Sequence, residues 1–134
     1  MTLLWAARLA AVFAVAVACY LTLTPDPNGA GLLPDYVGHL GIFAGVGASF
    51  AVLRRASGWS KAALGGLGFA VVVIGGGTEI GQSFTTRDPG LRDFAFDVIG
   101  GVSGLLLADW AAPRVWRGLD RVNDPSRSTG DSAP

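Results

Sequence analysis

Residues 75–104 read GGGTEIGQSFTTRDPGLRDFAFDVIGGVSG, two apolar runs joined by a short polar loop. The first run ends with Glu79 and Gln82, and Asp97 lies about one turn inside the second run. Carboxylates and amides are costly to remove from water, so an ordinary hydrophobic hairpin has no need of them here. The Gly75–Gly77 run is poor helix sequence, and the helix is expected to kink or loosen just before Glu79. This stretch predicts two membrane-spanning helices whose adjoining ends form one wall of a polar site.

Apolar runs of similar length occur elsewhere in the 134 residues, and about 20 apolar residues cross the hydrocarbon core of a bilayer. Hydrophobic residues make up 51% of the chain and charged residues 15%, which lies on the membrane side of globular averages. We therefore predict an all-α polytopic protein of the cell membrane, a four-transmembrane-helix bundle in residues 1–113. The expected spans are about 3–23, 36–53, 62–82 and 94–112. Pro113 is expected to end the fourth helix, leaving 114–134 as a cytoplasmic, largely disordered tail.

The first run, Leu3–Leu23, has a second interpretation as a signal peptide. Residues 16–19, AVAC, loosely resemble a lipoprotein cleavage box, but leucine is missing three residues before Cys19 and the charged amino-terminal region is thin. A membrane span is therefore the favoured interpretation. Cys19 is the only cysteine, which excludes an intrachain disulfide and a cysteine-based zinc cluster.

Small residues within the spans predict close helix packing. Gly41, Gly45 and Ala48 form a stripe at helical spacing in the second span, and Gly100 and Gly104 form a GxxxG pair in the fourth. Both patterns are typical of membrane helices that approach each other closely.

The basic residues predict the orientation of the chain. Eight of the ten lie at one end of the expected bundle: Arg8, Arg54, Arg55, Lys61, Arg114, Arg117, Arg121 and Arg127. Only Arg87 and Arg92 lie at the other end. The positive-inside rule therefore predicts that both termini are cytoplasmic and that the polar residues of the spans lie near the outer leaflet. The formal net charge is zero, so no nucleic-acid partner is expected.

The candidate site residues come from separate segments but share one depth. Those proposed for catalysis are His39, Glu79 and Asp97, and those proposed for substrate binding are Asp35, Gln82, Arg87 and Arg92. Intramembrane ionisable residues are functional hypotheses by default. Structural alternatives stay open: a helix-start carboxylate with an interfacial histidine, a snorkelled or protonated glutamate, and arginines that pair with acids. Asp109 and Trp110 are interpreted as interface residues at the cytoplasmic end.

A metal ion is a weaker prediction. The chain has no HExxH motif and no second histidine, which disfavours zinc. The acidic side chains would suit a hard divalent cation such as Mg²⁺ or Ca²⁺ better, but no cofactor is expected. No Ser-His-Asp order, P-loop or dinucleotide-binding motif is visible in a supporting context.

These motifs together resemble the VanZ-like family of small membrane proteins. Asp35, His39 and Phe43 match an Asp followed at four-residue intervals by His and Phe, and residues 79–82 match its Glu-x-x-Gln. Arg92 or Arg87, followed by Asp97 and Gly104, matches a loop arginine that precedes an Asp-x3-Asn-x2-Gly helix. The chain departs from this pattern at Tyr36, where lysine is usual, and at Gly101, where asparagine is usual.

The resemblance covers residues 35–104 and implies an integral envelope protein. The founding member of the family is linked to teicoplanin resistance, and no agreed biochemical activity comes with the family. Three hypotheses follow for this chain. The polar pocket binds, and in one version chemically alters, the headgroup of a lipid or lipid-linked envelope precursor. Alternatively, the protein is a proton-linked lipid or small-molecule transporter or a non-catalytic binding protein, or the polar residues only hold the helices together.

Overall fold

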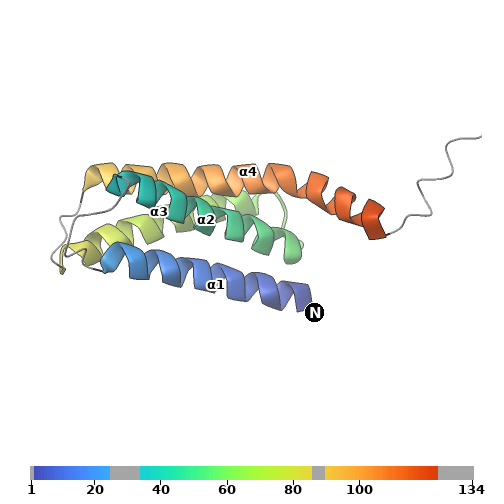
Figure 1. Ribbon diagram of the computed structural model, residues 1–134, viewed down its shortest axis with the longest axis horizontal. Coiled ribbons are helices and arrows are strands. Elements are labelled where there is room, and N and C mark those ends of the chain that lie inside the picture. Colours follow the sequence, from blue (N-terminus) through green and yellow to red (C-terminus); the bar gives the residue numbers. More distant parts are fainter. Residues whose placement is uncertain (1, 25–33, 86–89, 124–134) are drawn as a thin grey trace, which may run out of the picture.

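The computed structural model describes residues 2–24, 34–85 and 90–123, which form four helices lying side by side (Figure 1). The helices are α1 (Thr2–Leu23), α2 (Asp35–Ala56), α3 (Ala63–Gln82) and α4 (Leu91–Asn123). Each contains a segment long and apolar enough to cross a bilayer. The protein is therefore an all-α, multi-pass membrane protein, and the predicted fold class is confirmed.

The bundle has an apolar outer surface and a small core. Phe13, Phe69 and Leu107 are more than 60% exposed, although a water-soluble bundle would bury such side chains. Against lipid this exposure is favourable, because acyl chains are as apolar as the side chains themselves. The largest fully buried apolar side chains come from α2, α3 and α4: Phe43, Val46, Val71 and Leu105.

The closest packing in the bundle is between α2 and α4. A Cβ atom added at Gly100 would lie 3.0 Å from the Cα of Leu40, and one added at Gly104 would lie 2.8 Å from the Cα of Ala44. Leu40 and Ala44 meet Gly100 and Gly104 in the same order along the chain, so the two helices run parallel. The predicted GxxxG pair is thus a contact surface. Glycine is required there because backbone, not a flexible side chain, occupies the space.

Two expectations about the other glycines are wrong. A Cβ atom at Gly41 or Gly45 would meet nothing within 4 Å, so this stripe does not pack; Gly47 on a different face of α2 contacts α4 instead. The Gly75–Gly77 run does not loosen α3, which is continuous from Ala63 to Gln82. Gly75 is buried against α4, and this packing offsets its poor helix propensity.

The expectation that Pro113 ends the fourth helix is also wrong. Pro113 lies inside α4, which continues to Asn123 and changes direction towards its red end in Figure 1. Proline has no N–H, so the carbonyl of Asp109 loses its usual helical donor. The guanidinium of Arg55 donates to that carbonyl instead. Residues 114–123 are therefore helical, and residues 124–134 lie outside the described residues.

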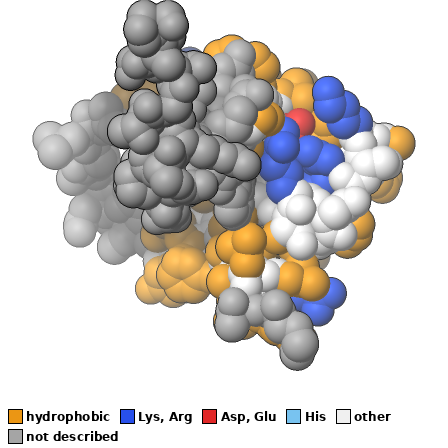
Figure 2. Space-filling view, turned by 90° about the vertical axis from the view of Figure 1, so that its right-hand side faces the viewer, with side chains coloured by type: hydrophobic (Ala, Val, Ile, Leu, Met, Phe, Trp, Pro, Cys, Tyr) orange, Lys and Arg blue, Asp and Glu red, His pale blue; other side chains and the backbone are white. Residues whose placement is uncertain are grey.

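The two ends of the bundle differ in chemistry. We call the end at which α2 and α4 begin the acidic end, because Asp35 and Asp93 lie in their first turns and Asp97 lies about one turn farther along α4. The opposite end, where α2 finishes with Arg54 and Arg55, is the basic end. Figure 2 looks onto the basic end, where Lys and Arg side chains gather beside the apolar surface. The prediction that the basic end faces the cytoplasm rests on the positive-inside rule.

Candidate functional site

The centre of the acidic end is a hydrogen bond between α2 and α4. His39 Nδ1 lies 2.8 Å from Asp97 Oδ1, and the side chains are 3% and 0% exposed. With Asp97 ionised, Nδ1–H is the donor and the carboxylate the acceptor, so the other ring nitrogen, Nε2, is left for other partners. Nε2 is buried and makes no hydrogen bond to the described residues. His39 is thus held at one nitrogen and available at the other.

Helix α3 shapes the space that Asp97 occupies. A Cβ atom at Gly75 would lie 3.1 Å from the Cβ of Asp97, so the absence of a side chain there lets α4 approach. Thr78 Oγ1 lies 3.5 Å from Asp97 Oδ2, and it also donates to the Gly75 carbonyl at 2.7 Å. Asp97 is therefore positioned by His39 of α2 and by Gly75 and Thr78 of α3.

Glu79 joins the same group from the last turns of α3. Its Oε2 accepts a hydrogen bond from the backbone N–H of Gly90 at 2.7 Å, just before α4 begins. A carboxylate at a helix N-terminus is favoured by the helix dipole, which gives Glu79 a structural role. Its Oε1 is buried and has no partner among the described residues. The structure brings the three residues proposed for catalysis together: one ligand atom from each of His39, Glu79 and Asp97 lies within 4.8 Å of the others.

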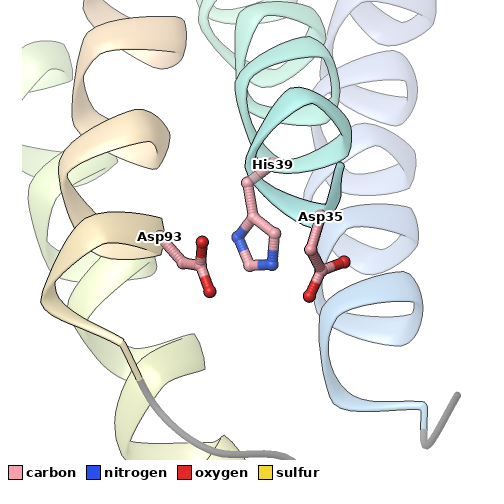
Figure 3. A group of neighbouring side chains, drawn as sticks. All are labelled: Asp35, His39 and Asp93. Carbon is pink, nitrogen blue, oxygen red and sulfur yellow. The ribbon is translucent and has the colours of Figure 1, made fainter. Parts of the chain in front are cut away.

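Two further carboxylates flank His39. Figure 3 shows the imidazole of His39 between Asp35 of α2 and Asp93 of α4, and one ligand atom from each lies within 4.8 Å of the others. Asp35 is exposed and Asp93 is half-buried, so this side of the histidine faces the end of the bundle. Asp93 was not among the predicted site residues. Its signal was the four-residue spacing from Asp97, which places both on one face of α4.

The remaining predicted binding residues, Gln82 and Arg92, have different surroundings. Gln82 contacts α1: its Nε2 donates to the carbonyl of Thr22 at 3.0 Å and so ties α3 to α1. The guanidinium carbon of Arg92 lies 4.2 Å from the ring centroid of Tyr36, so this arginine is held at the acidic end by a cation–π contact. Arg87 lies outside the described residues.

A second buried polar group lies at the basic end. Asp109 of α4 accepts hydrogen bonds from Arg54 and Arg55 of α2, and Arg54 also donates to the carbonyl of Trp59 at 2.6 Å. Asp109, interpreted as an interface residue, is buried and paired, since its side chain is only 9% exposed. Trp110, by contrast, is 63% exposed. This pairing was not predicted from the sequence, whose only signal for it was an acid opposite two arginines at the same depth.

The acidic end has the groups needed to bind polar ligands and to move a proton. A histidine held by a carboxylate at one nitrogen can accept a proton at the other, which is the arrangement of a general base and its orienting acid. Carboxylate oxygens accept hydrogen bonds from hydroxyl or ammonium groups, and an arginine can bind phosphate. These groups meet where the helices end, within reach of the membrane surface.

Comparisons of the chain with protein families, with curated proteins and with solved structures found no match. The resemblance to VanZ-like proteins therefore rests on the motifs alone and gives no family assignment. The chain is a four-helix multi-pass membrane protein.

Proposed function

We propose that the acidic end binds the headgroup of a membrane lipid or of a lipid-linked envelope precursor. The observation that carries this proposal is the buried His39–Asp97 pair, whose Nε2 has no hydrogen-bond partner among the described residues. A polar atom buried without a partner costs free energy, and a ligand that supplies the hydrogen bond recovers it. In the predicted orientation this end faces the outer leaflet, where headgroups are the most abundant polar ligands.

The charges at this end suit a headgroup that combines a phosphate with hydroxyl or ammonium groups. Arg92 is exposed and stacked on Tyr36, so its guanidinium can bind a phosphate without first being ordered. Asp35 and Asp93, which flank the histidine, offer acceptors beside it. His39 would then take or give a proton if the bound headgroup is altered, with Asp97 orienting its ring.

The core of the bundle favours a one-sided site over a transport path. From His39 towards the basic end, the buried side chains in the middle of the bundle are apolar and include Phe43, Val46 and Leu105. A proton or a polar substrate would need polar groups along this path, and no acid lies between Asp97 and Asp109 on α4. The transporter alternative therefore receives no support from the core. The link to teicoplanin resistance comes only from the family resemblance, and susceptibility of cells that express the protein would test it.

Lipid analysis of the purified protein tests the proposal. We expect wild type to carry a lipid class enriched over the surrounding membrane, and Glu79→Gln and His39→Ala to lose about tenfold of that enrichment, as expected for a missing charged hydrogen bond. Mass spectrometry of lipids that co-purify in mild detergent measures this. Ser103→Ala, at an exposed position in the middle of α4, is the control and should retain the wild-type lipids.

Protein abundance separates this function from a purely structural role. Gln at position 79 keeps an oxygen that can accept the Gly90 N–H, so Glu79→Gln should accumulate normally and melt near the wild-type temperature. His39→Gln serves as a second variant if His39→Ala accumulates poorly. Identical lipid complements in wild type and all variants would rule out headgroup binding, and low abundance of Glu79→Gln with unchanged lipids would support the structural role.

A further inference from the structure

The groups around His39 resemble the surroundings of a metal-binding histidine. A histidine that binds a metal through one ring nitrogen usually donates the N–H of the other to a carboxylate, which fixes the tautomer and orients the ring. Asp97 accepts such a bond from His39 Nδ1 at 2.8 Å and is fully buried. Nε2 consequently presents its lone pair away from Asp97. The side chain is 97% buried, and this nitrogen has no partner among the described residues.

The two outer carboxylates supply further ligands. In Figure 3 the ring nitrogen farther from the backbone, Nε2, lies on the side of Asp35, whereas Asp93 flanks the ring on the opposite side, from α4. One ligand atom from each of the three residues lies within 4.8 Å of the others. Bonds of about 2.0–2.2 Å hold the ligands of a metal ion about 3–4 Å apart, so the Asp93 carboxylate must turn towards Nε2 to complete the site. Asp35 and Asp93 are not fully buried, so both carboxylates can move.

We propose that Asp35, His39 and Asp93 bind one divalent transition-metal ion, with Asp97 as the carboxylate that orients His39. One imidazole and two carboxylates leave coordination positions open for water or a ligand. Two carboxylates also balance the charge of a divalent ion, which matters near the low-dielectric core. The ion would take the Nε2 lone pair that the headgroup proposal assigns to a hydrogen bond, so a headgroup at this site would then bind through the open positions of the ion and not to Nε2 directly. Binding of the ion itself needs no lipid.

The donor set favours Zn²⁺ and Mn²⁺ over Mg²⁺ and Ca²⁺. Imidazole suits transition metals, whereas Mg²⁺ and Ca²⁺ prefer oxygen ligands throughout. For a given set of nitrogen and oxygen ligands, Zn²⁺ binds more tightly than Mn²⁺ in the general order of affinities of divalent transition metals. The sequence alone disfavours zinc because the chain has one histidine; the structure adds the orienting Asp97 and the two flanking carboxylates.

Direct metal binding tests the proposal. The protein is purified in detergent with an affinity tag that contains no histidine, stripped with a chelator and titrated with Zn²⁺, Mn²⁺ and Mg²⁺ by calorimetry, with bound metal counted by mass spectrometry. We expect one Zn²⁺ per chain, weaker Mn²⁺ binding and little Mg²⁺ binding. Asp35→Asn and Asp93→Asn should each weaken Zn²⁺ binding at least about tenfold, and Asp97→Asn about 10- to 100-fold.

Variant folding is monitored in the same preparations. Zn²⁺ should raise the melting temperature of wild type but not that of Asp93→Asn, a half-buried position where the substitution preserves shape. Glu79→Gln discriminates between the two clusters that contain His39. Loss of Zn²⁺ in Glu79→Gln, with retention in Asp35→Asn and Asp93→Asn, would overturn the assignment. The absence of stoichiometric Zn²⁺ or Mn²⁺ binding to folded wild type at about 100 µM metal would also overturn it. Metal binding with unchanged lipids would leave this inference standing while the headgroup proposal fails.

Discussion

Gly104→Val is expected to prevent most of the protein from folding, so that little folded protein accumulates in the membrane. A Cβ atom at Gly104 would lie 2.8 Å from both the Cα and the carbonyl carbon of Ala44, and closer still to the carbonyl oxygen. Because these are backbone atoms, no side-chain rotation relieves the overlap, and α2 must separate from α4. Overpacking a well-packed core costs about 1–3 kcal/mol, and a clash with backbone lies at or above the top of that range. Melting temperature and monodisperse yield in detergent measure the effect.

Gly45→Val is the matched control for this prediction. Gly45 is on α2, and a Cβ atom added there would meet nothing within 4 Å. The same substitution should therefore leave the melting temperature nearly unchanged, and valine should face lipid. If Gly104→Val folds as well as Gly45→Val, the close α2–α4 contact does not hold the bundle together.

Asp109→Ala is expected to destabilise the basic end by about 3–5 kcal/mol, the usual cost of removing one partner from a buried ion pair. The side chain of Arg54 is only 7% exposed, and it would lose the carboxylate that accepts its guanidinium protons. Arg55 would lose a partner as well. The expected result is a lower melting temperature and reduced accumulation, measured against wild type in the same detergent.

A double variant separates the loss of the pair from the loss of packing. Arg54→Leu with Asp109→Leu replaces both charges by apolar groups, which is often neutral or stabilising for a buried pair. The double variant should therefore recover most of the stability that Asp109→Ala loses. If Asp109→Ala alone melts like wild type, Arg54 reaches water without its partner, and the pair contributes little.

The length and composition of the apolar runs were enough to predict the four spans. The expected bounds agree with the helices to within a few residues, except at the carboxyl end of α4. The meeting of His39, Glu79 and Asp97 was also accessible from sequence, because a span fixes the depth of each residue. Depth alone places their side chains near one end, and packing then brings them together.

The rotation of each helix about its axis was not accessible in the same way. A soluble helix shows its buried face as an apolar stripe, but membrane helices are apolar on every face, so periodicity gives little guidance. The sequence therefore did not distinguish Gly47, which packs, from Gly45, which does not. For the same reason it did not show that Gln82 turns towards α1.

The continuation of α4 past Pro113 depended on a partner far away in the chain. From the local sequence a helix break is expected at proline, because the carbonyl four residues earlier loses its N–H donor. Arg55, 54 residues earlier than Asp109, supplies that donor. The pairing of Asp109 with Arg54 was missed for a related reason, since residues at the ends of spans are usually assigned to the interface.

The parallel contact between α2 and α4 constrains how the chain assembles during synthesis. Translation places α2 in the bilayer first, and residues 57–90 must follow before α4 can reach it. Until then His39 and Arg54 of α2 lack their partners Asp97 and Asp109, which belong to α4. Insertion of the earlier spans and consolidation of the bundle are therefore separate events, and the second cannot begin until the ribosome has delivered the fourth helix.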